Sequence, residues 1–307
     1  MMERVLVLGA SGFVGRALMD RLGERALGTY ASRPVANGVR FDAASDDLDS
    51  LLAAHGPFSH AVVLFGVIDP LRCAREPEAT ARVNVEAAIS ALSGLANAGV
   101  TPVYLSSDYV FDGAAGNFRE DDPVAPVCAY GRQKALVEQW LAENLGQYLL
   151  VRTAKVYADL PGAGGILNSM IDEARRAVDT GETLVCASDQ RFSPTLDTDL
   201  ARGLEALMAA GETGTWHVCG PRALKRRELL ALVLERLEIM VGVRGKPIND
   251  FGLPEPWPVD TSLDAGKHGS RFGALTDVAQ ALNRLVARLL AAQPQGRMPG
   301  QGEEVRA

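Results

Sequence analysis

The chain has 307 residues, 47% of them hydrophobic and 22% charged, which suits a globular protein with one large core, with or without a smaller domain. Its net charge of −7 disfavours binding to nucleic acids and to anionic lipid, because both need a basic surface. No segment approaches the length of a membrane-spanning helix, and the apolar run at the N-terminus is too short for a signal peptide, so we expect a cytoplasmic protein.

Strand-like and helix-like segments alternate through the first half of the chain. Short apolar runs predict strands at residues 5–8, 26–30, 39–42, 61–65, 102–106 and 148–153. Helical spacing lies between them at residues 13–22, 48–54, 78–98 and 127–144. This alternation predicts an α/β fold with a doubly wound parallel sheet of the Rossmann type.

The second half is less regular and predicts a smaller, interleaved C-terminal substrate-binding domain. It has helical spacing at residues 166–178 and 227–237 and strand-like runs at 183–186 and 215–219. We expect a cofactor domain over residues 1–158, with returns near 190–222, and mainly a substrate domain over 159–292. Residues 293–307 are rich in Gly, Pro and Gln, which predicts a disordered tail.

A glycine-rich turn, G-x-x-G-x-x-G, joins the first predicted strand to the first predicted helix. Small residues let the backbone approach a pyrophosphate, and the helix start offers free N–H groups and a positive dipole end. Because glycine turns also occur for structural reasons, the position between strand and helix supports the assignment to a dinucleotide. The predicted contacts are Gly9, Ser11, Gly12, Phe13, Val14 and Gly15.

The segments after the next strands indicate which dinucleotide is bound. An acid after the second strand would favour NAD, whereas this chain has Ser32 and Arg33, which suit the 2′-phosphate of NADPH; NADH stays an alternative. Asp42 is placed to bond the adenine amino group. Arg33 as a solvated loop charge and Asp42 as a simple loop carboxylate remain competing interpretations. Phe65 and Gly66, after the fourth strand, complete this side of the predicted cofactor site.

The predicted catalytic residues lie on a helix and at a strand end. Tyr130 and Lys134 form Y-x-x-x-K, and the i, i+4 spacing puts both on one helix face, where the ammonium is expected to lower the pKa of the phenol. Tyr130 then serves as general acid in reduction and as general base in oxidation. Ser107, preferred over its neighbour Ser106, stands at the carboxyl end of the fifth strand and can bond the substrate oxygen.

These motifs together make the chain resemble the extended short-chain dehydrogenase/reductases, and more narrowly the dTDP-4-dehydrorhamnose reductase family. The resemblance covers nearly all of residues 3–290. Its most specific part reads Ser-Ser-Asp-Tyr-Val-Phe-Asp-Gly over residues 106–113. The other matching segments are the glycine turn, Asn84 within residues 83–87, Tyr130 with Lys134, and residues 151–153, 189–195 and 260–264.

The resemblance implies hydride transfer from NADPH to the 4-keto group of a nucleotide-linked 6-deoxy sugar. Ser107 takes the place of the family's catalytic threonine, Lys134 also holds the nicotinamide ribose, and Asn84 belongs to the cofactor site. Asp108, Tyr109 and Arg191 are assigned to the substrate. The chain departs from the family at Lys155, where an aromatic residue, often Trp, is usual, and we expect Lys155 to contact the substrate.

Two other functions stay open. One is a nucleotide-sugar epimerase or dehydratase that keeps its cofactor bound, although Arg33 and the missing acid argue against tightly bound NAD. The other is a non-catalytic regulatory subunit of the methionine adenosyltransferase type, which shares this fold. The scattered cysteines and histidines predict no metal site, and the sequence does not decide between a monomer and a homodimer.

Overall fold

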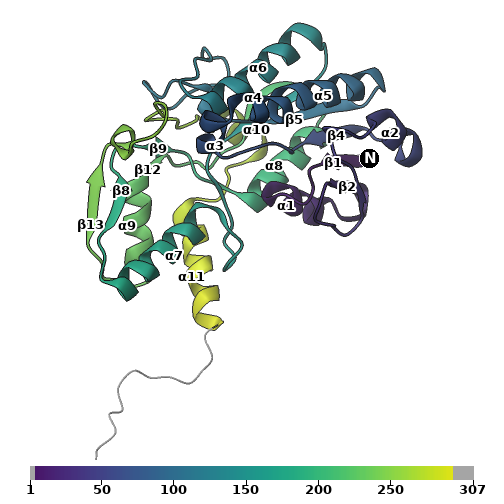
Figure 1. The fold of residues 1–307 in the computed structure, drawn as a ribbon. Helices are drawn as coiled ribbons and strands as arrows, with labels where there is room; N and C mark the ends of the chain where they lie inside the picture. Colours follow the sequence, from purple (N-terminus) through teal and green to yellow (C-terminus); the bar gives the residue numbers. More distant parts are fainter. Residues whose placement is uncertain (1–3, 293–307) are drawn as a thin grey trace, which may run out of the picture.

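The computed structural model describes residues 4–292 and contains a seven-stranded parallel sheet (Figure 1). The strand order is β11-β6-β5-β4-β1-β2-β3, so the chain runs outwards from β1 in both directions, as predicted for a doubly wound sheet. The strands are β1 (Val5–Leu8), β2 (Ala26–Tyr30), β3 (Gly38–Arg40), β4 (His60–Val63), β5 (Thr101–Ser107), β6 (Leu149–Thr153) and β11 (Gly214–His217).

Helices cover both faces of this sheet, and the strands are apolar on both sides. In β1, Val5 and Val7 pack against α1 (Phe13–Leu22) and α8 (Asp197–Ala209), whereas Leu6 and Leu8 face the opposite layer. That second layer consists of α2 (Leu48–His55), α5 (Ala88–Asn97) and α6 (Ala129–Asn144). Figure 1 shows α5 and α6 on one side of the strands and α1 and α8 on the other. Burial on both faces explains the continuous apolar run of residues 5–8.

Most predicted elements are present, with several differences at their ends and in the second half. The strands at 5–8 and 26–30 and the helix at 13–22 are confirmed to the residue. The third strand ends at Arg40, which leaves Asp42 in the following loop. The helix expected at 78–98 is α4 (Pro77–Ala81), a π-helical segment (Arg82–Ala87) and α5 in succession. Four helices are present that the sequence patterns did not predict: α3 (Pro70–Arg75), α8, α10 (Gly266–Phe272) and α11 (Val278–Ala291).

A smaller part beside the sheet has its own core, formed chiefly by α7 (Gly165–Thr180), α9 (Arg226–Arg236) and α11. Figure 1 shows these helices together with β8 and β13, away from the central strands. The pairs β7–β10, β9–β12 and β8–β13 complete this part. Their bounds are β7 (Val156–Tyr157), β8 (Leu184–Ala187), β9 (Arg191–Phe192), β10 (Thr195–Leu196), β12 (Leu224–Lys225) and β13 (Val243–Lys246).

Between residues 4 and 292, no helix is both long enough and apolar enough to cross a membrane. The tail that the sequence predicts to be disordered, residues 293–307, lies outside the described residues.

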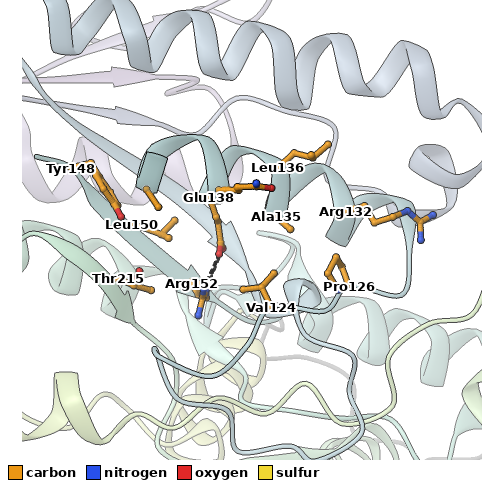
Figure 2. Close-up of a pocket in the computed structure, with 12 residues that line it drawn as sticks. Val124, Pro126, Arg132, Ala135, Leu136, Glu138, Tyr148, Leu150, Arg152 and Thr215 are labelled. Atoms are coloured by element: carbon orange, nitrogen blue, oxygen red, sulfur yellow. Dashed lines mark hydrogen bonds and ion pairs between the residues drawn. The ribbon is translucent and has the colours of Figure 1, made fainter. Parts of the chain in front are cut away.

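A buried ion pair links α6 to strand β6 of the sheet. Arg152 of β6 donates to Glu138 of α6, with 2.8 Å between Nη2 and Oε2, and each side chain is only 5% exposed. Arg152 also donates to the main-chain oxygen of Glu120 at 3.2 Å. The pair borders a hollow of about 610 Å³ between α6 and the β6–β11 edge (Figure 2). None of the predicted site residues lines this hollow.

We expect Glu138→Ala to lower the free energy of unfolding by about 3–5 kcal/mol, because Arg152 would be left buried without a countercharge. Chemical denaturation measures the change. Glu76→Ala is the control, since Glu76 pairs with Arg72 on the surface, where both side chains are more than half exposed, and its loss should cost below about 1 kcal/mol. Equal effects of the two substitutions would contradict the prediction.

Candidate active site

The carboxyl ends of β1, β4, β5 and β6 open onto one cleft of about 660 Å³. Parallel sheets place binding sites at this edge, because the loops there can carry side chains without disturbing the sheet. The cleft brings together most residues that the sequence predicts for the site. They are Gly9, Gly12, Phe13, Val14, Gly15, Arg33, Phe65, Gly66, Ser107, Asp108, Tyr109, Tyr130, Lys134 and Lys155.

The glycine turn forms one end of the cleft, and its glycines are required by close contacts. Gly9 has φ +92°, and a Cβ there would lie 2.7 Å from the main-chain nitrogen of Phe65. A Cβ on Gly15 would lie 2.5 Å from the main-chain oxygen of Gly9. The following helix α1 begins without a side-chain cap and without an acid in its first turn. Its first N–H groups are therefore suited to an anion such as a pyrophosphate.

Arg16 is a cleft residue that the sequence analysis missed. It directly follows the third glycine, and its guanidinium donates to the main-chain oxygen of Ser11 at 2.8 Å. The sequence signal for Arg16 was a basic residue in the first helical turn after the glycine motif. Arg16 and Arg33 thus place two cations in the lining of the cleft.

Four predicted cofactor residues do not line the cleft, and three of them are Ser11, Ser32 and Asp42. Ser11 offers its main-chain oxygen to Arg16, and Ser32 is exposed in the loop after β2. The Asp42 carboxylate accepts from the main-chain N–H of Ala44 at 3.1 Å, which closes its own loop. Their contacts with a cofactor remain predictions.

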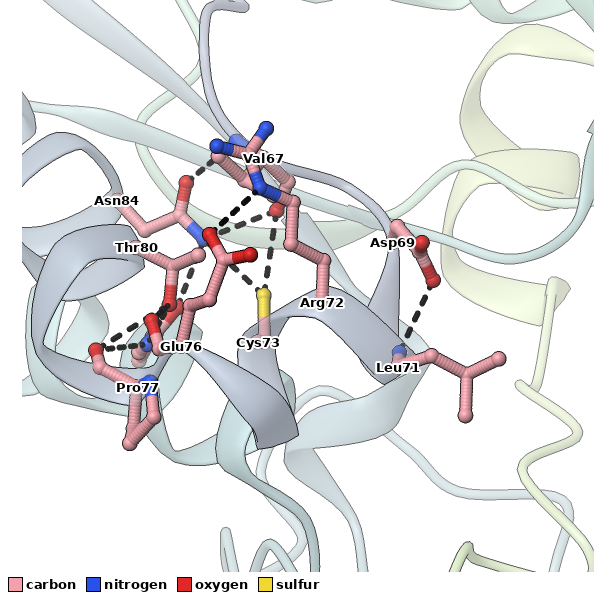
Figure 3. A network of polar contacts seen from close by, with 10 residues as sticks. Val67, Asp69, Leu71, Arg72, Cys73, Glu76, Pro77, Thr80 and Asn84 are labelled. Atoms are coloured by element: carbon pink, nitrogen blue, oxygen red, sulfur yellow. Dashed lines mark hydrogen bonds and ion pairs between the residues drawn. The ribbon is translucent and has the colours of Figure 1, made fainter. Parts of the chain in front are cut away.

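Asn84 is also outside the cleft lining, and it shapes the cleft indirectly (Figure 3). The side-chain oxygen of Asn84 accepts a hydrogen bond from the main-chain N–H of Val67 at 2.7 Å. Its side-chain nitrogen donates to the main-chain oxygen of Val67 at 2.9 Å. It also donates to Gln133 of α6 at 2.8 Å. A Cβ on Gly66 would lie 2.9 Å from the Asn84 oxygen. Asn84 therefore fixes the loop after β4, and a direct cofactor contact remains a prediction.

Tyr130 and Lys134 lie on the inner face of α6, 9% and 8% exposed. The Lys134 ammonium donates to the main-chain oxygen of Leu105 at 2.9 Å, and burial lowers its pKa to about 8. Burial raises the pKa of the Tyr130 phenol, and the hydroxyl of Ser107 opposes this shift. The pKa of Tyr130 is therefore raised, contrary to the lowering expected from Lys134, because the loss of water outweighs the nearby groups. Because its pKa is raised, Tyr130 holds its proton at neutral pH.

The two serines at the end of β5 differ in their bonding. The hydroxyl of Ser107 lies 2.9 Å from an Asp108 carboxylate oxygen and accepts from the N–H of Tyr109 at 3.2 Å. The Ser106 hydroxyl also borders the cleft but is buried without a hydrogen-bond partner among the described residues. Ser107 is thus oriented by its neighbours, which supports its choice over Ser106.

Lys155 and Tyr109 form a second polar group in the cleft. The Lys155 ammonium donates to the Tyr109 hydroxyl at 3.0 Å, and Gln190 donates to the same oxygen at 3.3 Å. Burial lowers the pKa of Lys155, but attraction from Tyr109 and Asp108 outweighs burial, so the pKa is raised overall. Lys155 therefore keeps its charge near neutral pH.

Arg191, predicted as a substrate contact, is exposed and does not line the cleft. Its guanidinium lies 3.6 Å from the carboxylate of Asp260. Gln190 and Thr261, neighbours of these two residues, reach the site instead through Tyr109 and Asp108. Both stand in segments that carried the family resemblance, which was the signal for them.

Comparison with known proteins gives the family. The family model described as the RmlD substrate binding domain matches residues 2–291. The chain belongs to this family. A dTDP-4-dehydrorhamnose reductase of Streptomyces griseus is 34% identical over 69% of this chain and 67% of that protein. A "Probable dTDP-4,6-dihydroxy-2-methyloxan-3-one 4-ketoreductase" of Streptomyces antibioticus is 30% identical over 94% of this chain and 97% of that protein.

Solved structures agree on the fold. The dTDP-4-dehydrorhamnose reductase of Bacillus anthracis, in complex with NADP, has a TM-score of 0.79 at 22% identity and covers 94% of this chain and 99% of its own. The resemblance predicted from the motifs is confirmed, as is the Rossmann-type sheet. The predicted class, an oxidoreductase of the extended short-chain type, agrees with the family and with the reductases among its relatives.

Proposed function

We propose that this protein catalyses NADPH-dependent reduction of the 4-keto group of a nucleotide-linked 6-deoxy sugar, with Tyr130 as proton donor. The observation that carries the proposal is the convergence of Ser107, Tyr130 and Lys134 on the same cleft as the glycine turn. The names of the relatives, which include two kinds of reductase for dTDP-linked substrates, support the substrate class.

The charge of the cleft supports anionic ligands. The whole chain carries a net charge of −7. Of the described residues that line the cleft, however, four are cationic and only Asp108 carries a carboxyl group. The cations are Arg16, Arg33, Lys134 and Lys155. NADPH and a nucleotide sugar both carry several phosphate charges, which cations at a low-dielectric cleft attract.

Each residue has a defined task in this mechanism. When bound, NADPH supplies the hydride. The glycine turn and Arg16 would hold the pyrophosphate, Arg33 would hold the 2′-phosphate, and Lys134 would hold the nicotinamide ribose. The Tyr130 hydroxyl gives its proton to the substrate oxygen as negative charge develops there, and Ser107 keeps Tyr130 and that oxygen aligned.

The test is the oxidation of NADPH in the presence of dTDP-4-keto-6-deoxy sugars. Stoichiometric loss of NADPH and formation of the 4-hydroxy product support the proposal. An epimerase or dehydratase would convert its substrate without net loss of NADPH, and a regulatory subunit would bind cofactor without turnover. Either result would overturn the proposed reduction.

We predict that Tyr130→Phe lowers turnover by about 10²-fold or more, because general acid catalysis contributes roughly that much. The ring keeps its packing, so the Kd for NADPH should not change. Steady-state kinetics measure the turnover, and a binding titration measures the Kd for NADPH. Tyr157→Phe is the matched control, since the Tyr157 hydroxyl is buried, lies outside the cleft lining and has no described partner. Turnover retained in Tyr130→Phe would exclude Tyr130 as the acid.

We predict that Arg33→Ala weakens NADPH binding by about 1–3 kcal/mol, the scale of a charge-assisted hydrogen bond, and leaves NADH binding nearly unchanged. Titration of NADPH and of NADH into the unmodified protein and into Arg33→Ala measures the four dissociation constants. The control is Arg75→Ala, because Arg75 is exposed and does not line the cleft. Equal affinities of the unmodified protein for NADPH and NADH would contradict the prediction.

We predict that Lys155→Ala raises the KM for the sugar substrate while the Kd for NADPH stays constant, because the ammonium lies at the substrate end of the cleft. Lys155→Met keeps the aliphatic stem and separates loss of charge from loss of packing. Steady-state kinetics of the three proteins measure the change. A shift in kcat/KM below about threefold, or about 0.7 kcal/mol, would show that Lys155 does not select the substrate.

A further inference from the structure

A network of buried polar groups joins helix α6 to the loop that follows β4 (Figure 3). We call residues 65–68 the β4 loop, and three of its four residues, Phe65, Gly66 and Ile68, line the cleft. The main-chain nitrogen of Phe65 also lies against the glycine turn, 2.7 Å from the place of a Cβ on Gly9. Val67 stands between cleft residues, so a displacement of Val67 would move the cleft lining on both sides of it.

The β4 loop is held at one point. Among the described residues, its main-chain hydrogen bonds are all made at Val67, and they go to Asn84 and to the thiol of Cys73. Gly66 beside it has φ +151°, where a backbone without a Cβ is free to move. On the other side, Ile68 is 72% exposed and gains little from packing. The shape of the loop therefore depends on the bonds that Asn84 makes.

The orientation of the Asn84 amide decides whether these bonds form. Asn84 is 3% exposed and lies within the π-helical segment Arg82–Ala87, an uncommon type of turn that often occurs at functional sites. The amide has an oxygen that accepts and a nitrogen that donates. Only one of its two orientations therefore serves both the N–H and the carbonyl oxygen of Val67.

Gln133 of α6 fixes that orientation. It is 5% exposed, and its side-chain nitrogen donates to the main-chain oxygen of Pro77 at 3.1 Å and to the Thr80 hydroxyl at 2.8 Å. A carbonyl oxygen such as that of Pro77 can only accept, so Gln133 must turn its own side-chain oxygen the other way. There this oxygen accepts from the Asn84 nitrogen at 2.8 Å. Asn84 is left with its oxygen towards the loop.

We propose that Gln133 is a positioning residue that orients Asn84 and so keeps the β4 loop in the shape that accepts NADPH. Gln133 lies between Tyr130 and Lys134 in the same turn of α6, so the contact also ties the loop to the helix that carries them. The inference rests on the proposed NADPH-dependent function. It assigns a task to a residue inside the Y-x-x-x-K motif that the motif itself leaves open.

This role predicts an effect on cofactor binding and not on the later steps. If the loop is no longer held, NADPH has to order it on binding, and the cost raises the Kd. At saturating NADPH the loop is back in place, so kcat and the KM for the sugar should change little. A residue that only stabilises the fold would lower the free energy of unfolding and leave the Kd unchanged.

Gln133→Met tests the proposal, because methionine keeps the length and packing of the side chain but cannot donate to Pro77. We expect the Kd for NADPH to rise about tenfold, the scale of one buried hydrogen bond. A titration of NADPH without sugar measures this Kd. Steady-state kinetics should show the same rise in the KM for NADPH, with kcat within about twofold of the wild type.

Thr80→Val is the matched control. Thr80 is 1% exposed and bonds the same amide group, but it lies off the route from Gln133 to the β4 loop. The Pro77 oxygen still holds Gln133 in this variant. Chemical denaturation should show a lower free energy of unfolding for both variants, whereas the Kd for NADPH should rise in Gln133→Met alone. An equal rise in both would overturn the proposal.

A double-mutant cycle tests whether Gln133 acts through Asn84. Asn84→Ala removes both bonds to Val67 and should raise the Kd for NADPH at least as much as Gln133→Met. Adding Gln133→Met to Asn84→Ala should then raise the Kd no further. Additive effects of the two substitutions would overturn the proposal.

Hydrogen exchange of the wild type covers the case in which the variants do not fold. The Val67 N–H should exchange slowly before NADPH is added, because Asn84 already binds it in the free protein. Fast exchange that becomes slow only with NADPH would show that the cofactor, and not Gln133, orders the loop. That result would also overturn the proposal.

These outcomes are distinct from failure of the proposed function. The titration needs no sugar, so a wild type that binds NADPH but reduces no 4-keto nucleotide sugar would overturn the proposed reduction and still allow the test of Gln133. A wild type that reduces such a sugar, with an unchanged Kd for NADPH in Gln133→Met, would overturn the role of Gln133 alone.

Discussion

The approach of α6 to the loop after β5 controls the geometry of the whole site. At Gly131 a Cβ atom would lie only 2.0 Å from the main-chain oxygen of Tyr109. Any larger residue would push the helix away from the sheet. Glycine at this position lets Tyr130 lie in the same cleft as Ser107 and lets Lys134 reach the carbonyl of Leu105 at the strand end. The buried pair of Glu138 and Arg152 holds the same helix one to two turns further along.

The same packing sets the acid–base chemistry. Tyr130, Lys134 and Asp108 are all at least nine-tenths buried, so water contributes little to their charged forms. Burial raises the pKa of Tyr130 and of Asp108 and lowers that of Lys134 to about 8. Each group therefore holds or releases a proton according to its hydrogen-bond partners. Such burial also slows the exchange of these protons with solvent, which suits the proposed transfer of a proton from Tyr130 to the substrate.

The cleft at the strand ends is lined by several cationic side chains. The Lys155 ammonium is held by its hydrogen bond to the Tyr109 hydroxyl. Arg16 and Arg33 line the same cleft. A chain with a net charge of −7 thereby presents a cationic cleft. The net charge disfavours a general affinity for nucleic acid, whereas the cleft suits small phosphorylated ligands.

The sequence by itself determined the sheet, the cofactor turn and the Ser107–Tyr130–Lys134 set. These depend on local patterns: an apolar run buried on both faces, glycines where the backbone must come close, and i, i+4 spacing on one helix. Only the tertiary structure decided that Asn84 holds the loop after β4 and that Asp42 closes its own loop. It alone placed Arg191 beside Asp260 and brought Gln190 and Thr261 to the site. It also reversed the expected shift in the pKa of Tyr130. Such properties depend on groups far apart in the chain and on how much water their packing removes, and no local pattern records either.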